Sequence, residues 1–223
     1  RVGRAPPLSR SMDARRHRRR RQRSRRIRAV LAAGLVLGIG TVATLAAWTD
    51  TENARGSFAS SVFGTESQSA GSPTYTSNTA APGATLTFAA TAMSPGTSFH
   101  AWLNIRTTTA STVGGTVSLA SATAAGDLGP ALQYRAVRMT AATPTATCNA
   151  ATFTTGTPAF VAGASGTYLS ASQVPATPVA TTIGAGGAEV GFCIEVRIAP
   201  GAADTFQGRT GTVTWGFTAV STG

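Results

Sequence analysis

Hydrophobic and polar residues alternate with a period of two along three stretches of the chain. The stretches are SFHAWLNIRT at 98–107, GFCIEVRIAP at 191–200 and RTGTVTWGFTAV at 209–220. Such alternation is typical of a β-strand with one buried face, and the β-branched and aromatic residues in these stretches favour the same structure. The pattern therefore predicts three strands, each with one face toward a common core.

Weaker alternation predicts further strands at Ser57–Phe63, Thr85–Thr91, Thr116–Ala120, Leu132–Thr140, Thr152–Thr155 and Thr167–Leu169. No stretch after Ala47 keeps an apolar stripe of helical period over three turns. We therefore expect an all-β protein whose domain, residues 84–223, is a jelly-roll-like antiparallel β-sandwich. Residues 65–83 are polar and contain two prolines, so we expect a linker or surface loop there. Residues 141–188 are expected to form long loops with short strands.

The first 46 residues have a different character. An arginine-rich stretch, 15–28, precedes an apolar run from Ala29 to Ala47, which is the layout of a secretory signal. The small residues Thr44 and Ala46 predict cleavage between Ala46 and Ala47, so that a mature N-terminal segment, 47–64, begins there. At about 1.5 Å per residue the run is also long enough to span a bilayer, which leaves an uncleaved membrane anchor as the alternative. Met12 is a candidate start of translation.

Charge is distributed very unevenly. Of the 19 arginines behind the formal net charge of +11, thirteen fall within residues 1–28, whereas the rest of the chain holds six arginines and seven acids. The basic character thus belongs to the leader, where it keeps that end on the cytoplasmic side of a membrane. The nearly neutral remainder argues against a nucleic-acid partner, and contact with a membrane is expected only through the signal segment.

Two cysteines, Cys148 and Cys193, lie in the part of the chain that follows the signal. An even number of cysteines in an exported protein favours a disulfide. Because no C-x-x-C pair is present, we interpret this disulfide as structural.

The sequence offers few groups for catalysis. His100 is the only histidine after the leader, and its place in an alternating stretch suggests a surface or edge residue rather than a base. There is no H-E-x-x-H metal motif and no G-x-S-x-G nucleophile elbow. No pair of acids near in sequence suggests glycosidase chemistry, and distant pairs such as Glu189 with Asp204 stay open. We therefore expect no catalytic, cofactor or metal site and no enzyme activity.

The stretch TLAAWTDTENARGSFASS, Thr44–Ser61, resembles the signal-cleavage region and mature start of the TasA/camelysin family, exported through a SipW-type signal peptidase. The similarity rests on a small-residue cleavage site, an Ala-aromatic-x-Asp start and a following S-F-A-S strand. The turn MSPGTSF at 93–99 and the C-terminal stretch 193–221, with its F-Q-G turn, are similar to later parts of the family pattern. The match covers both ends of the mature chain, and the middle aligns only loosely.

This resemblance implies a secreted jelly-roll domain that assembles, without covalent links, into fibres of a cell surface or biofilm matrix. In such fibres the mature N-terminal segment would add as a donor strand to the next copy or to a related matrix protein. The candidate anchors of that strand are Trp48, Phe58, Val62 and Phe63. The alternative is a monomeric, secreted or membrane-anchored binding module of unknown ligand. A camelysin-like protease is disfavoured, since no metal motif is visible.

Overall fold

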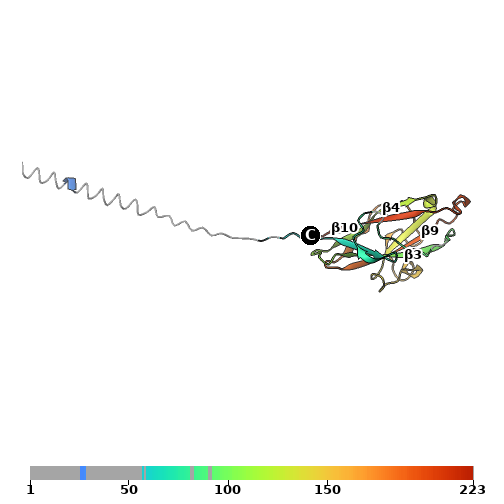
Figure 1. The fold of residues 1–223 in the computed structure, drawn as a ribbon, viewed down its shortest axis with the longest axis horizontal. Helices are drawn as coiled ribbons and strands as arrows, with labels where there is room; N and C mark the ends of the chain where they lie inside the picture. Colours follow the sequence, from blue (N-terminus) through green and yellow to red (C-terminus); the bar gives the residue numbers. More distant parts are fainter. Residues whose placement is uncertain (1–25, 29–56, 58, 81–82, 90–91, 223) are drawn as a thin grey trace, which may run out of the picture. The chain divides into compact units, whose positions relative to one another are not determined.

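The computed structural model describes residues 26–28, 57, 59–80, 83–89 and 92–222 (Figure 1). The chain divides into two units, Arg1–Ser57 and Phe58–Gly223. The expected cleavage residues Thr44, Ala46 and Ala47, and the expected anchors Trp48 and Phe58, lie outside the described residues. Within the described ranges, no helix has the length and apolar character needed to cross a membrane.

Two antiparallel sheets contain all the named strands of the second unit. The larger sheet has the spatial order β2 (Ser72–Thr76), β1 (Thr65–Ser69), β3 (Ser98–Thr107), β9 (Glu189–Ile198), β5 (Leu132–Arg138) and β6 (Ala159–Ala162), and β7 (Leu169–Ser170) also pairs with β5. The smaller sheet has the order β10 (Thr212–Ser221), β4 (Gly115–Ala125) and β8 (Thr181–Ile183). Three short 3-10 helices, η1 (Gly129–Ala131), η2 (Ala150–Phe153) and η3 (Asp204–Phe206), lie in the connections.

The connections make the sandwich jelly-roll-like. The successive strands β3, β4 and β5 alternate between the two sheets, and β8, β9 and β10 alternate in the same way. As a result β9 inserts between β3 and β5, while β8 pairs with β4 in the facing sheet. Strands from the two halves of the chain are thus paired in both sheets, as in double-sheet Greek-key folds. The expected all-β sandwich is confirmed.

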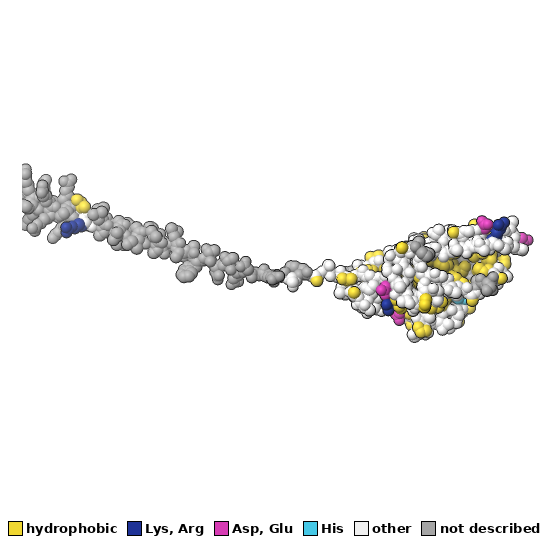
Figure 2. Space-filling model, viewed as in Figure 1, with side chains coloured by type: hydrophobic (Ala, Val, Ile, Leu, Met, Phe, Trp, Pro, Cys, Tyr) yellow, Lys and Arg dark blue, Asp and Glu magenta, His cyan; other side chains and the backbone are white. Residues whose placement is uncertain are grey.

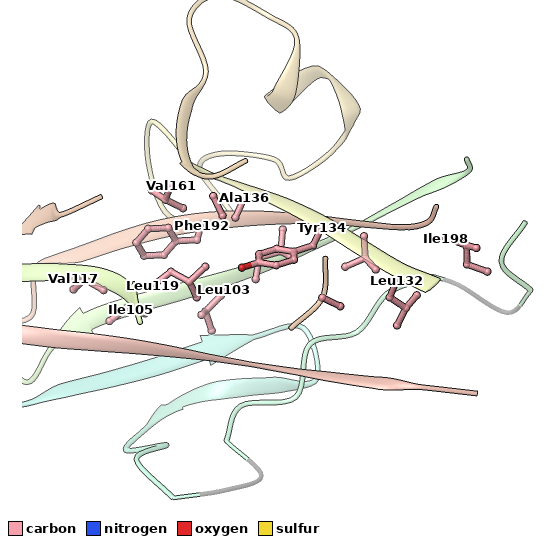
Figure 3. Packing of buried hydrophobic residues seen from close by; sticks show 14 of the residues in the cluster. Leu103, Ile105, Val117, Leu119, Leu132, Tyr134, Ala136, Val161, Phe192 and Ile198 are labelled. Carbon is pink, nitrogen blue, oxygen red and sulfur yellow. The ribbon is translucent and has the colours of Figure 1, made fainter. Parts of the chain in front are cut away.

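The core lies between the sheets and is formed by alternate residues of the long strands (Figure 3). Leu103 and Ile105 of β3, Tyr134 of β5 and Phe192 of β9 face Val117 and Leu119 of β4, and each is at most 7% exposed. Complete burial of such a side chain contributes on the order of 1.5–3 kcal/mol. The alternation of hydrophobic and polar residues in the sequence therefore identifies the residues that face the core in each sheet.

The polar stretch 65–83, expected as a linker or loop, instead begins with the hairpin β1–β2. Strand β1 pairs with β3 from Thr65↔Thr107 to Ser69↔Leu103. Backbone hydrogen bonds to an existing strand edge do not require apolar side chains, so the hydrophobic pattern gave no signal here. An ion pair between Glu66 and Arg106, with an N–O distance of 2.8 Å, adds to this pairing.

Three other expected strands are absent from their described positions. One is Thr85–Thr91, of which residues 85–89 are described and have no regular secondary structure. Residues 59–63 have no regular secondary structure, and strand pairing begins only at Thr65. At Thr152–Thr155 the chain turns through η2, because Asn149 and Thr152 form a capping box around its first turn. The Asn149 side chain accepts a hydrogen bond from the Ala151 N–H at 3.0 Å, and the Asn149 N–H donates to Thr152 Oγ1 at 3.1 Å.

The variant Phe192→Ala is expected to lower the free energy of unfolding by about 3–5 kcal/mol, because it leaves a cavity where the ring packs against Phe217. Val220→Ala is the matched control, since Val220 is 59% exposed and its truncation should change stability by no more than about 0.5 kcal/mol. Urea denaturation of both variants measures the difference. Equal losses would contradict the assignment of Phe192 to the core.

Candidate functional site

The outer face of the larger sheet carries charged residues that are aligned across three strands. His100 of β3 lies directly opposite Glu195 of β9, and Glu195 lies directly opposite Arg135 of β5. All three side chains point away from the core, because they alternate with inward residues on their strands. The loops that follow β5 and β6 cover this row, so Glu195 is 2% exposed and Arg135 is 9% exposed. We call His100, Glu195, Arg135 and Tyr168 the polar cluster.

Glu195 accepts two hydrogen bonds in the polar cluster and forms an ion pair with Arg135. Nε and Nη2 of Arg135 each lie 2.7 Å from Glu195 Oε2, and the Tyr168 hydroxyl donates to Oε1 at 2.5 Å. The Arg135 guanidinium also lies 4.8 Å from the centroids of both the Phe153 and Tyr168 rings. Charge-assisted bonds of this kind are stronger than neutral ones, and aromatic faces favour a neighbouring cation. The buried charge of Arg135 is therefore fully compensated.

The surroundings also fix the ionisation state of Glu195. Burial alone would raise its pKa, but the polar hydrogens of His100, Ser98, Tyr168 and Arg135 favour the carboxylate and lower the pKa to about 2. Burial and the bond to Glu195 raise the pKa of Tyr168. A general base requires a pKa near the working pH, so Glu195 is suited to binding a cation rather than to accepting protons.

The position of His100 differs from the expectation. It was expected at a surface or edge, but β3 has β1 on one side and β9 on the other, and the His100 side chain is 17% exposed. Its Nε2 is buried 3.7 Å from Glu195 Oε2, outside hydrogen-bond range, and has no hydrogen-bond partner among the described residues. Its ring packs against Phe153 at a centroid distance of 5.7 Å.

The predicted disulfide is confirmed, and it holds the covering loop in place. Cys148 bonds to Cys193 of β9, with 5.2 Å between the Cα atoms. Around it lies a second apolar cluster, made of buried Val137, Met139 and Phe153 and packed against Trp102 and Phe160. The loop that follows β5 thus covers Cys193 on the outer face of β9. Among the described residues, no group of three or more His, Cys, Asp or Glu side chains is placed to hold a metal.

Val62 and Phe63, two of the expected donor-strand anchors, are held by their own domain. The Val62 N–H donates to Thr112 Oγ1 and the Thr112 N–H donates to the Val62 carbonyl, both at 2.9 Å. The Phe63 ring is half-buried and lies so close to Gly115 that a Cβ atom there would come within 2.9 Å of it. Val62 keeps 48% of its surface exposed. These residues therefore fasten the start of the domain to the connection between β3 and β4.

The smaller sheet presents the candidate interaction surface, the outer edge of β10. Strand β10 pairs with β4 over its whole length, and no strand among the described residues pairs with its other side. Such an edge offers a row of unpaired N–H and C=O groups to another strand. Beside it the segment 84–89 turns Leu86 and Phe88 toward the core, with the Phe88 ring 6.2 Å from that of Trp215. In this segment the Thr85 carbonyl accepts a hydrogen bond from Ser69 Oγ, and the Thr85 N–H donates to Ser72 Oγ. Its described hydrogen bonds thus join it to the β1–β2 hairpin rather than to β10.

Sequence reasoning missed the polar cluster. His100, Glu195 and Arg135 could be placed on strands, but only the register of β3, β9 and β5 shows that they are direct neighbours. Tyr168 falls in the expected strand Thr167–Leu169, and in the structure it directly precedes β7, but nothing in the sequence indicates that it contacts Glu195. Comparison of the chain with models of known protein families gives no match, and comparison with curated proteins gives no significant one.

The variant Glu195→Gln is expected to lower the free energy of unfolding by about 3 kcal/mol at pH 7, since it removes the charge that Arg135 requires. The folded-state pKa of about 2 lies below the usual value of 4.5, so ionised Glu195 stabilises the fold above about pH 4.5. That contribution is lost as the pH falls toward 2, and the two proteins should converge over this range. Denaturant titrations at several pH values measure it, and a gap that is constant with pH would contradict the assignment.

Replacing both cysteines by alanine is expected to lower the free energy of unfolding by up to about 4 kcal/mol, the entropy estimate for a loop closed over 45 positions. Addition of a reducing agent should shift the wild-type denaturation midpoint toward that of the double variant and leave the variant unchanged. Wild-type protein that shows the same midpoint with and without the reductant would argue against a stabilising disulfide.

Proposed function

We propose that the protein is a secreted structural subunit of a bacterial cell surface or extracellular matrix, which assembles non-covalently by donor-strand exchange. The observation that supports this proposal is the long outer edge of β10, with which no strand among the described residues pairs. The donor is the segment Ala47–Phe58, which precedes the domain, and the acceptor is the β10 edge of the next copy. The sequence contains no lysine, so lysine-based covalent links between subunits are excluded.

The edges of the two sheets differ in a way that favours β10. Strand β2, at one edge of the larger sheet, contains Pro73, which lacks a backbone N–H, and its pairing with β1 is irregular. At the other edge β6 has four residues and β7 two, and the outer strand β8 of the smaller sheet has three. Short or interrupted edges add strands poorly, whereas β10 is ten residues long. Of the described edges, β10 is thus the best suited to β-augmentation.

The proposed donor has a suitable length. The twelve residues of Ala47–Phe58 extend over about 40 Å as a strand, and the ten residues of β10 over about 33 Å. The compact domain begins at Phe58, and Val62 and Phe63 are already bound to it. This narrows the exchangeable part of the mature segment to residues 47–58. Trp48 and Phe58 then remain as its large apolar side chains.

The buried Nε1 of Trp215 adds support, because it has no hydrogen-bond partner among the described residues. Buried N–H groups are usually paired, and a segment added beside β10 can supply the missing acceptor. The donor segment and the acceptor edge are different surfaces of one molecule. Two copies joined by one such contact therefore still have one donor segment and one acceptor edge unused. Repetition of such a head-to-tail contact produces a filament.

The second candidate, a monomeric binding module of unknown ligand, uses the same edge. A related matrix protein or another extended peptide can pair with β10 in place of a second copy.

Deletion of residues 47–55 is expected to abolish filaments while the domain stays folded. Thr214→Lys together with Thr218→Lys should also reduce assembly, because lysines on an edge strand disfavour the addition of another strand. The matched control is Thr123→Lys, opposite Thr214 on the inner strand β4. Electron microscopy and sedimentation measure assembly, and circular dichroism checks folding. Filaments from the deletion variant would refute donor-strand exchange, and monomers from the wild-type chain would favour the second candidate.

A further inference from the structure

Arg197 of β9 has a side chain held by two neighbours, and none of the described residues provides a carboxylate partner for it. Its Cζ lies 3.4 Å from the centroid of the Tyr168 ring, and its Nε and Nη2 donate to Gln133 Oε1 at 3.2 and 3.1 Å. These contacts fix the plane of the guanidinium. They leave its Nη1 side unbonded among the described residues.

The other charges of the domain show why this is unusual. Arg106, Arg135 and Arg209 each pair with a carboxylate, from Glu66, Glu195 and Asp127 respectively. Within the described ranges, Arg138 and Arg197 have no such partner, and Arg138 is exposed without a stacking contact. Arg197 is half-buried, and the nearby Glu195 already accepts from Arg135 and Tyr168. Charged side chains are sparse on the visible face of the domain (Figure 2). A guanidinium that is held in one orientation, with no carboxylate partner among the described residues, therefore suggests an anionic ligand from outside the domain.

The proposed donor segment contains carboxylates that need a cation. Asp50 and Glu52 are two residues apart, so in an extended segment they share a face with Trp48 and Phe58. That face cannot enter an apolar core without burying two charges, which is costly unless each is paired. An arginine whose fork is held in one plane is the side chain best suited to receive a carboxylate.

Arg197 also lies at the end of the domain that a head-to-tail neighbour would meet. It pairs with Ser98, the first residue of β3, whereas the start of the domain is bound near Thr108, just beyond the last residue of that strand. The two ends of β3 are about 30 Å apart.

We propose that Arg197, held by Tyr168 and Gln133, is a carboxylate-binding site, and that its ligand is Asp50 or Glu52 of a second copy of the chain. The identity of the ligand rests on the proposed function, whereas the site rests on the geometry of Arg197. The contact would fix the position of the donor segment at this end of the sandwich. It is electrostatic and should weaken as salt is raised.

The test is a titration of the full-length chain, isotope-labelled and kept dilute enough to be monomeric, with a peptide of residues 47–58. The Arg197 Nε–H resonance, assigned from its absence in Arg197→Gln, should shift with the peptide. A peptide carrying Asp50→Asn and Glu52→Gln should bind up to about fivefold more weakly, as expected for loss of one partly exposed ion pair. In the protein, Arg197→Gln should weaken binding of the native peptide to a similar extent, and Arg138→Gln should leave it unchanged.

Equal binding of the native and neutral peptides would overturn the proposal, even if Arg197→Gln does not fold. A scrambled acidic peptide that shifts Arg197 equally would overturn the assignment of the ligand. Asp50 and Glu52 can also be substituted in the dilute, monomeric chain itself. If this shifts the Arg197 Nε–H resonance, the contact lies within one molecule, and the proposal that the ligand comes from a second copy is refuted. If the Arg197→Gln variant forms filaments as well as the wild type, and the peptide does not shift the Arg197 resonance, this inference is refuted and the proposed function is not. Peptide binding at Arg197 without filaments would support the site and contradict the proposed function.

Discussion

Burial of both faces of β9 is the constraint on which the rest of the domain depends. Its inner face supplies Phe192, Ile194 and Val196 to the core, and its outer face carries Cys193 and Glu195 under the loop that follows β5. A strand buried on both sides must satisfy every polar group that it carries, because water cannot reach them. The hydrogen bonds from Arg135 and Tyr168 and the disulfide to Cys148 meet this requirement. They also explain why a domain with so few charges keeps an ion pair in its interior.

The sequence allowed the long strands to be predicted, because their signal is local. The alternation in 98–107, 191–200 and 209–220 needs no knowledge of neighbours, and these stretches became β3, β9 and β10. The hairpin β1–β2 could not be found in this way, since its polar residues are held by backbone pairing with β3. Likewise, the pairing of Glu195 with Arg135 depends on a register between residues that are 60 positions apart. Cys148 and Cys193 are separated almost as widely, but they were predictable because cysteine chemistry leaves only one partner.

The two sheets of the domain differ in how firmly they are held. The larger sheet is reinforced on its outer face by the disulfide, the polar cluster and the pair of Glu66 and Arg106. The smaller sheet has three strands, and its outer strand β10 has only β4 as a hydrogen-bonded neighbour among the described residues. In the assembly proposed above, a strand added at β10 would leave the contacts of the larger sheet and of the core in place.

A bulge limits where an added strand can pair with β10. The register with β4 shifts between Gly216 and Phe217, so the edge is divided into two regular halves. The second half ends at Ser221, opposite Gly115 of the inner strand β4, against which the Phe63 ring packs. The first half, Thr212–Gly216, begins at the end of the sandwich where the Leu128 N–H bonds to Thr210 and where β9 ends after Arg197. In the proposed assembly, a segment that pairs with this half would enter at the same end as the Arg197 guanidinium. The first regular half of β10 and Arg197 thus lie at the same end of the domain.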